Sequence, residues 1–389
     1  MNVGIMVMDL IVSGGAQRQA IELARCLKKN GHSVTMYALY YDGERCYPHL
    51  TKDLNIKFIS KGAEEKGWPL KLHHRNKMMR RLVDMVDPGT DVLNMHLLPH
   101  PAATYFRSRF DIPVVAMVND VPLPTHSATG KSWPKRKMIS MMTRINYGLY
   151  KKEFGTMDRL VVLDRRDQGW LLRHYGKESR VIHSGLNLDE FKFVARERNR
   201  KLKILTAGIF FPHRRLEDVV QSVKILKERG VPFEYHHIGS DAMSRDYAET
   251  VYRAASEANL GDAVKFHGFV SNEELVRFYA SSDVFVFPNS PQSWGLAVFE
   301  AMACGTPVIC STGAGAHEVL TNEKDALLVP PKSPESIAAN LIRLHEDEGL
   351  WKGLHVNGRA FVENHITWEI YAKEMLEEFD KAVKGRGGK

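Results

Sequence analysis

The sequence has few cysteines, and none of them is spaced for a disulfide framework or a metal site. The 389-residue chain contains only Cys26, Cys46, Cys304 and Cys310, and no two of them form a C-x-x-C pair. A small secreted fold stapled by disulfides would need a denser set of cysteines. We therefore expect a reducing, cytoplasmic environment.

Long hydrophobic runs are also lacking. The apolar start MNVGIMVMDLIVSGG has no basic leader and stops at two glycines, well short of the roughly 20 apolar residues that a membrane span needs. It is typical of a first buried strand. Apolar residues make up 44% and charged residues 26% of the chain, which excludes the disordered and fibrous classes. The length predicts two domains with a cleft, each with its own core.

Acidic residues are absent from residues 121–152. This segment interleaves apolar and aromatic side chains with basic ones: Lys131, Lys135, Arg136, Lys137, Arg144, Lys151 and Lys152. The pattern is typical of a peripheral contact with an anionic membrane, through residues 131–152, or with a phosphorylated acceptor. It is equally typical of a solvated helix whose apolar face belongs to the core. No nucleic-acid-binding motif accompanies the charge, so we expect no nucleic-acid partner.

Apolar strand-like runs alternate with helical patterns along the whole chain, as in parallel α/β layers. In the first half a helix is expected at 16–29 and strands at 3–8, 33–38, 92–95, 114–118 and 160–163. The pattern restarts after a polar stretch, 195–203, with strands at 204–207, 233–238, 264–266, 284–287, 308–310 and 326–329, and a last helix at 368–383. We predict an α/β fold with two Rossmann-like, doubly wound domains, 1–185 and 186–366.

The loop after the first strand is a candidate anion site. Ser13-Gly14-Gly15-Ala16 leads directly into a helix, whose N-terminus offers free N–H groups, and glycine lets a ligand approach the backbone. The loop does not match the dinucleotide pattern G-x-G-x-x-G. A plain turn is the alternative.

The turn after the first strand of the second half carries two adjacent arginines. Arg214 and Arg215 follow Gly208 at the expected carboxyl edge of the sheet, where ligands bind in such folds. Guanidinium groups offer paired donors to a diphosphate. The alternative is that the arginines pair with Glu217 and Asp218 at the start of the next helix.

The most informative block is Pro288–Ile309. A strand enters a Ser/Pro/Gly loop, a short helix follows, and a Gly-Thr-Pro turn leads into another strand. Glu300 lies on this helix among small and apolar neighbours. A buried carboxylate is costly without a partner, and a ribose diol would supply two hydrogen-bond donors. An exposed glutamate with no ligand is the alternative.

The sequence resembles the retaining glycosyltransferases of the GT-B fold, in particular family 4, over nearly its whole length. The resemblance rests on the order and spacing of several segments: Gly14–Arg18, Gly31-His32, Ile182–Phe191, His267–Phe269 before Asn272–Leu275, Trp294–Pro307, Gly313–Glu318 and Asp325–Val329. It implies that a last helix, 367–384, packs back on the N-terminal domain.

The resemblance also implies roles for individual residues. Glu300 would bind the ribose hydroxyls, and the backbone of Gly295 and Leu296 would meet the sugar and phosphate. Arg214 stands at the place of the family's phosphate-binding lysine. Gly15 would lie against the diphosphate. The strand-end loops near Gly239 and Gly268-Phe269-Val270 would hold the base, and Gly208 is a further donor-binding residue.

Three positions depart from the family pattern. The first glutamate of the usual E-x7-E pair is replaced by Gln292, an amide that can still contact the donor sugar. The arginine that accompanies the phosphate lysine is replaced by Ile209, for which Arg215 is expected to compensate. The common His-Asp pair aligns with Asn119-Asp120, which we take, with Gln292, as the candidate catalytic residues.

The resemblance implies an enzyme that transfers a sugar from a nucleoside-diphosphate sugar to a hydroxyl of a glycan, lipid-linked or small-molecule acceptor, in the biosynthesis of cell-surface glycans or glycoconjugates. No Asp-x-Asp of the metal-dependent kind occurs, so we expect no metal and no cofactor beyond the donor. Two alternatives stay open: a nucleotide-sugar epimerase on the same fold, and a sugar-nucleotide-binding protein with decayed catalysis.

Overall fold

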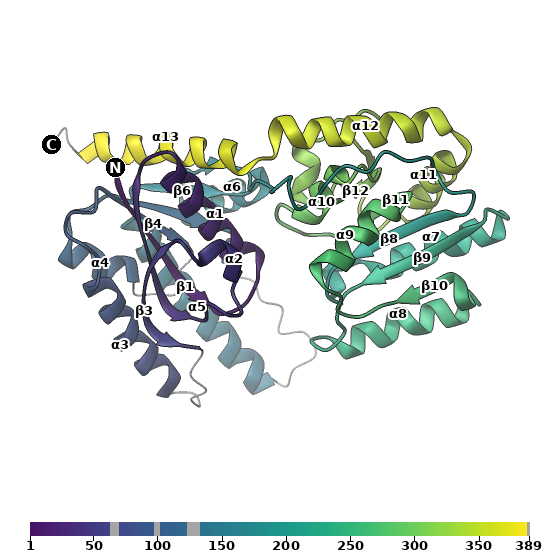
Figure 1. Ribbon diagram of the computed structural model, residues 1–389. Coiled ribbons are helices and arrows are strands. Elements are labelled where there is room, and N and C mark those ends of the chain that lie inside the picture. The colour runs from purple at the N-terminus through teal and green to yellow at the C-terminus, as the bar shows by residue number, and fades with distance from the viewer. Residues whose placement is uncertain (63–69, 97–101, 123–132, 387–389) are drawn as a thin grey trace. The chain divides into compact units, whose positions relative to one another are not determined.

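The computed structural model describes residues 1–62, 70–96, 102–122 and 133–386, with 70–75 and 133–143 described by their backbone alone. The chain separates into two compact units (Figure 1). Unit 1 comprises Met1–His183 and Trp368–Lys389, and unit 2 comprises Ser184–Thr367. None of the described helices is long and apolar enough to cross a membrane.

Unit 1 is built on a seven-stranded parallel sheet in the order β3-β2-β1-β4-β5-β6-β7. The central strands are apolar runs, as expected for a parallel sheet that is covered on both faces. The strands are β1 (Asn2–Leu10), β2 (Ser33–Tyr41), β3 (Asn55–Lys61), β4 (Val92–His96), β5 (Val114–Val118), β6 (Arg159–Val162) and β7 (Arg180–Val181).

Helices cover both faces of this sheet. One face contacts α3 (Leu70–Asp84), α4 (Ala102–Arg109) and α5 (Trp133–Gly155), and the other contacts α1 (Gly15–Lys29) and α13 (Trp368–Arg386). The remaining helices are α2 (Pro48–Thr51) and α6 (Arg165–Trp170), the latter continued by a π-helical turn, Leu171–Tyr175.

The last helix, α13, is fixed to unit 1 by a buried carboxylate. Glu378 is fully buried and accepts hydrogen bonds from Arg159 at 2.7 Å, Arg180 at 3.0 Å and Lys381 at 2.7 Å. Arg159 and Arg180 begin β6 and β7, so this cluster joins the end of the chain to one edge of the sheet.

Unit 2 contains a six-stranded parallel sheet in the order β10-β9-β8-β11-β12-β13. Its strands are β8 (Leu202–Ala207), β9 (Phe233–Ile238), β10 (Val264–Phe266), β11 (Val284–Phe287), β12 (Val308–Ser311) and β13 (Leu327–Val329). Its helices are α7 (Leu216–Glu228), α8 (Arg245–Glu257), α9 (Asn272–Ser281), α10 (Leu296–Ala303), α11 (Pro334–Glu346) and α12 (Glu348–His365).

The polar stretch 195–203 enters this unit along a buried aspartate. Asp283 accepts hydrogen bonds from the Arg196 side chain at 2.9 Å and from the backbone N–H groups of Asn199 and Lys203 at 3.0 and 2.8 Å. Its backbone oxygen accepts a further bond from the indole of the buried Trp351 at 2.8 Å. One aspartate therefore sets where β8 begins.

The doubly wound α/β architecture predicted from the hydrophobic pattern is confirmed in both units. Every predicted strand is present, several of them longer than predicted, and the last helix extends to Arg386. Two edge strands, β3 and β7, were not predicted. Strand β3 is polar and only half-buried, and β7 has two residues, so neither leaves a clear apolar pattern.

Candidate functional site

Three glycines form a close-packed ledge at the carboxyl ends of neighbouring strands in unit 2. Gly208 follows β8, Gly239 follows β9, and Gly268 lies two residues beyond β10, with φ angles of +139°, +157° and +67°. Gly208 N–H donates to Ile238 O, and Gly239 N–H donates to Gly268 O, both at 2.8 Å. A Cβ on Gly239 would lie 2.0 Å from the Gly208 oxygen. Gly239 thus has no room for a side chain, and the positive φ angles favour glycine at all three positions, so a ligand can approach bare backbone here.

Arg214 lies directly beside the ledge. It ends the 3-10 turn Pro212–Arg214, and a Cβ added to Gly208 would lie 3.3 Å from its guanidinium carbon. Its Nε is buried with no hydrogen-bond partner among the described residues, and burial lowers its pKa. A desolvated guanidinium that the described part of the chain leaves without a carboxylate is well suited to an anionic ligand.

Arg215 has different contacts. It has a φ of +52° and precedes α7, and its guanidinium forms ion pairs with Glu217 at 2.6 Å and Asp218 at 2.7 Å. These contacts match the alternative predicted for the arginine pair, although for one arginine only. Arg214 and Arg215, which the sequence analysis considered as one pair, therefore have different surroundings in the structure.

Glu300 is held by a buried hydroxyl. The fully buried Tyr279, from α9, donates a hydrogen bond to Glu300 Oε2 at 3.0 Å. Burial raises the pKa of Tyr279 well above its ordinary value, the Glu300 carboxylate raises it further, and Arg214 lowers it. The carboxylate on α10, which follows β11, and the guanidinium after β8 therefore come from two strands that are paired in the sheet.

The loop before α10 presents a helix N-terminus at the same edge of the sheet. Gly295 has a φ of +103° and packs so tightly on Phe287 that a Cβ would lie 2.8 Å from its ring. Leu296 begins α10, which has no side-chain cap and no acidic residue in its first turn. Gln292 is held by its backbone, which bonds to Gly313 O at 3.2 Å and to Gly315 N–H at 3.0 Å. Backbone N–H groups at such a terminus favour an anion.

An exposed aromatic side chain stands next to the ledge. Phe269 follows Gly268 and is 88% exposed, the largest exposure among the large apolar side chains described. Val270 beside it is half-buried. Exposed aromatic surface of this kind is a platform on which a planar ring can stack.

Unit 1 has a pocket of about 190 Å³ at the carboxyl edge of its own sheet. It is lined by the end of β1, the start of α1 and the ends of β4 and β5: Val7, Met8, Asp9, Ala16, Gln17, His96, Asn119 and Asp120. The predicted pair Asn119-Asp120 thus lies in a cavity. Gly15 begins α1 next to Ala16, with no atom within 4 Å of the place of a Cβ.

His96 was missed by the sequence analysis, because a lone histidine at the end of an apolar strand usually belongs to the core. It is 5% exposed, and neither ring nitrogen has a partner among the described residues. Burial lowers its pKa to about 4, so the ring is neutral at physiological pH. The only available signal was the polar pair Asn94 and His96 within one buried strand.

Two family models match the chain along consecutive stretches. Residues 13–190 match Glycosyltransferase Family 4, and residues 188–361 match Glycosyl transferases group 1. The chain belongs to glycosyltransferase family 4.

Relatives of this family 4 chain are distant in sequence. The D-inositol 3-phosphate glycosyltransferase of Streptomyces bingchenggensis is 26% identical over 248 residues, which cover 59% of this chain and 54% of the relative. The chain spans about half the length of the first curated relatives it matches.

Solved structures show the GT-B fold. The sucrose-phosphate synthase of Thermosynechococcus elongatus has a TM-score of 0.78 at 21% identity, covering 99% of this chain and 100% of the other. Anabaena HepE, solved in complex with UDP-glucose, has a TM-score of 0.74 at 14% identity, covering 98% and 100%.

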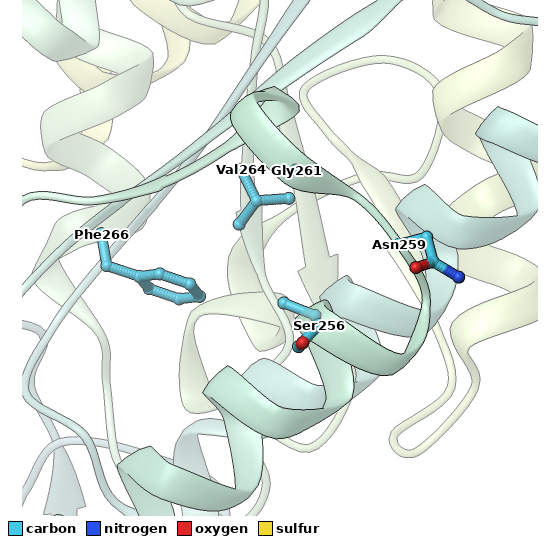
Figure 2. Close-up of a pocket in the computed structure, with 6 residues that line it drawn as sticks. Ser256, Asn259, Gly261, Val264 and Phe266 are labelled. Carbon is cyan, nitrogen blue, oxygen red and sulfur yellow. The ribbon is translucent and has the colours of Figure 1, made fainter.

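A second, more open hollow of about 450 Å³ lies on unit 2 of this family 4 chain (Figure 2). It lies beside the end of α8 and the edge strand β10, and its lining residues are Ala255, Ser256, Asn259, Gly261, Val264 and Phe266. None of these carries a charge, so the hollow offers no counter-ion to a diphosphate.

The basic segment 131–152 is described in part. Lys131 and the side chains up to residue 143 lie outside the described residues. Farther along α5, Arg144, Lys151 and Lys152 are exposed, and Ile145 is 54% exposed. Among the described side chains, the segment therefore joins exposed basic groups with at least one exposed apolar group.

Proposed function

We propose that this protein is a retaining glycosyltransferase that moves a sugar from a nucleoside-diphosphate sugar to a hydroxyl of an acceptor. The observation that carries the proposal is the placement of Arg214 beside the glycine ledge after β8, and of Glu300, held by Tyr279, on the helix that follows the neighbouring strand β11. Opposite charges at one carboxyl edge match a nucleotide, which has a diphosphate at one end and a ribose diol in the middle.

Each group then has a part in holding the donor. The Glu300 carboxylate accepts hydrogen bonds from the ribose hydroxyls, while Tyr279 holds its other oxygen in place. Arg214 and the N–H groups around Gly295 and Leu296 bind the diphosphate. The backbone at Gly208 and Gly239 and the ring of Phe269 contact the rest of the nucleotide. Gly15 stays a predicted diphosphate contact from unit 1.

The chemistry follows from these charges. The acceptor oxygen attacks the anomeric carbon on the face of the leaving group, and the bond from that carbon to the diphosphate oxygen breaks. The acceptor proton passes to the departing diphosphate, whose growing charge Arg214 and the α10 N-terminus stabilise. Gln292 contacts the donor sugar, and Asn119 and Asp120 act from unit 1. Arg215, paired with Glu217 and Asp218, shapes the turn that positions Arg214.

The donor can be tested by thermal shift with UDP, GDP and ADP, since a ligand that binds the folded state raises the melting temperature. Glu300→Ala and Arg214→Ala should each weaken binding of the best of these about 10- to 100-fold, because each removes a charge-assisted hydrogen bond. The exposed Glu335→Ala and Arg229→Ala are matched controls that should bind as the wild type does. If both site variants bound the nucleotide as tightly as the wild type does, the proposed donor site would be wrong.

The competing functions give different products. An epimerase would convert a nucleotide sugar into its epimer with no acceptor present. A protein with decayed catalysis would bind the donor but release no nucleoside diphosphate across an acceptor panel. A transferase releases nucleoside diphosphate only when an acceptor is present, and we expect its rate to be unchanged by EDTA because the chain supplies its own positive groups.

We further propose a peripheral contact with anionic membrane, as expected of an enzyme that makes cell-surface glycans on the inner membrane face. The exposed Ile145 among Arg144, Lys151 and Lys152 supports it, because an apolar group can insert while the basic groups meet anionic lipid. Ile145→Asp should reduce sedimentation with vesicles of phosphatidylglycerol. The 73% exposed Met243 of unit 2 provides the control Met243→Asp. Equal sedimentation of all three proteins would contradict the contact.

A further inference from the structure

A series of buried hydroxyl and imidazole groups ends at the glycine ledge of unit 2. His237, on β9, is fully buried, and its Nδ1 lies 2.7 Å from the hydroxyl of Thr206 on β8. The same hydroxyl lies 2.8 Å from the hydroxyl of Tyr235. The other ring nitrogen of His237, Nε2, lies 3.2 Å from the place of a Cβ on Gly239, a point only 2.0 Å from the Gly208 oxygen. The imidazole therefore joins the interior of unit 2 to the ledge.

The hydrogen bonds determine which nitrogen of this imidazole carries the proton. Burial and the nearby Arg214 lower the pKa of His237 to about 3, so the ring is neutral at physiological pH and has one N–H. Burial raises the pKa of Tyr235, which keeps its proton, and Thr206 is its one partner among the described residues. Tyr235 therefore donates to Thr206, and Thr206 donates to Nδ1 of His237. The proton of the ring lies on Nε2.

The Nε2–H of His237 faces the backbone of Gly208. Nε2 has no partner of good hydrogen-bond geometry in the described part of the chain, but the Gly208 backbone acts on it as an acceptor and raises the pKa of the ring. A buried N–H without an acceptor is costly, so a small movement that completes this bond is favourable. His237 thus holds the Gly208 oxygen on the side of β9.

The orientation of this carbonyl determines where the next backbone N–H points. A trans peptide holds its C=O and N–H on opposite sides. The Gly208 oxygen lies against Gly239, which follows β9, so the Ile209 N–H points to the other side, on which β11 pairs with β8. This N–H has no hydrogen-bond partner among the described residues. The N-terminus of α10, which follows β11, offers further N–H groups, and such groups favour an anion.

We propose that His237 is a positioning residue of the donor site, and that it directs the Ile209 N–H to the diphosphate by holding the Gly208 carbonyl. The inference rests on the proposed donor site. It makes the backbone of residue 209 a phosphate ligand, although the side chain there is an uncharged isoleucine. His237 is fully buried, so it acts only through the ledge.

The experiment is NMR on the full chain with ¹³C at the glycine carbonyls and ¹⁵N in isoleucine and histidine. The sequence contains two Gly-Ile pairs, Gly4-Ile5 in β1 and Gly208-Ile209, so a spectrum that correlates carbonyl and amide has two signals, and the first is an internal control. The best binder among UDP, GDP and ADP should shift the Ile209 N–H and leave Ile5 in place. The His237 nitrogens, assigned by comparison with His237→Gln, should show the Nε2–H tautomer. An Nδ1–H tautomer, or an Ile209 N–H that ignores a bound nucleotide, would overturn the proposal.

Four variants separate positioning from a general structural role. His237→Gln retains an N–H at the reach of Nε2 and should keep the nucleotide affinity within about 3-fold, whereas His237→Asn reaches only Thr206 and should weaken it about 10-fold. Thr206→Val removes the hydroxyl that fixes the tautomer and should weaken binding as well. Tyr235→Phe also loses a buried hydrogen bond but leaves Thr206 able to donate to His237, so it should bind as the wild type does. Affinities that simply follow the four melting temperatures would contradict a positioning role.

The donor site and the role of His237 are decided by different signals. If no nucleoside diphosphate binds the wild type, the proposed donor site is wrong. The Gly208 carbonyl signal then still tests His237, because we expect it to shift in His237→Asn and to stay in place in Tyr235→Phe. A Gly208 signal that is the same in His237→Asn and in the wild type would show that His237 does not hold this carbonyl.

Discussion

Gly239→Ala should destabilise unit 2 and disrupt the ledge beside Arg214. The added Cβ would lie 2.0 Å from the Gly208 oxygen and 2.6 Å from the Gly208 carbon, so the two backbones must separate. The φ of +157° is also unfavourable for alanine. Backbone strain costs about 1–3 kcal/mol, and loss of one of the two ledge hydrogen bonds costs about 1 kcal/mol more.

The expected loss is therefore about 2–4 kcal/mol, which lowers the melting temperature of a unit of this size by about 4–16 °C. Calorimetric unfolding measures the shift, and titration with UDP, GDP and ADP measures the donor site, which should weaken as the ledge opens. The control is Gly353→Ala in the middle of α12, where no atom lies within 4 Å of the new Cβ. This control should be neutral or stabilising by up to about 1 kcal/mol. A Gly239→Ala protein that melts with the wild type would refute the close packing of the ledge.

Three further outcomes are expected. Tyr279→Phe removes the 3.0 Å hydrogen bond to Glu300 and should weaken nucleoside-diphosphate binding about 10-fold, with the ring packing retained; calorimetric titration against the wild type checks this. Arg215→Ala should lower the melting temperature through loss of its ion pairs with α7 but weaken binding much less than Arg214→Ala; the opposite order in paired titrations would reverse the roles given to the two arginines. Burial alone would raise the pKa of Glu378, but its hydrogen bonds with basic side chains lower it below the ordinary value, so its contribution is present above the unfolded pKa and lost as the pH falls through the folded one. Glu378→Gln should therefore flatten the fall in unit 1 stability below about pH 4, and melting curves that keep the wild-type slope would contradict this.

The sequence predicts the layers of this protein well because buried parallel strands such as β5 and β11 are short, continuous apolar runs between turn residues. A continuous apolar run directly indicates a buried strand, so these strands can be predicted without knowing what packs against them. Strand β3 was not predicted because its exposed edge position allows lysine, asparagine and serine along its length.

The candidate site could be predicted only in part. Glu300 stood out because its neighbours in sequence are apolar, but its partner Tyr279 lies 21 residues away on another helix. Arg214 and Arg215 differ in the structure through the backbone at one residue, since the positive φ of Arg215 directs its side chain to α7. His96 could be recognised as a pocket residue only from the structure, in which the ends of β1, β4 and β5 line one pocket.

The path of the chain makes unit 2 an insertion within unit 1. Its two ends are paired, since Leu186 bridges to Thr367 and its N–H donates to Ile366 O at 3.0 Å. Deleting the chain from Trp368 onward would thus remove α13 from unit 1 and expose the face it covers, leaving unit 2 intact. The segment Ser184–Thr367 is, by the same reasoning, the natural fragment to express by itself.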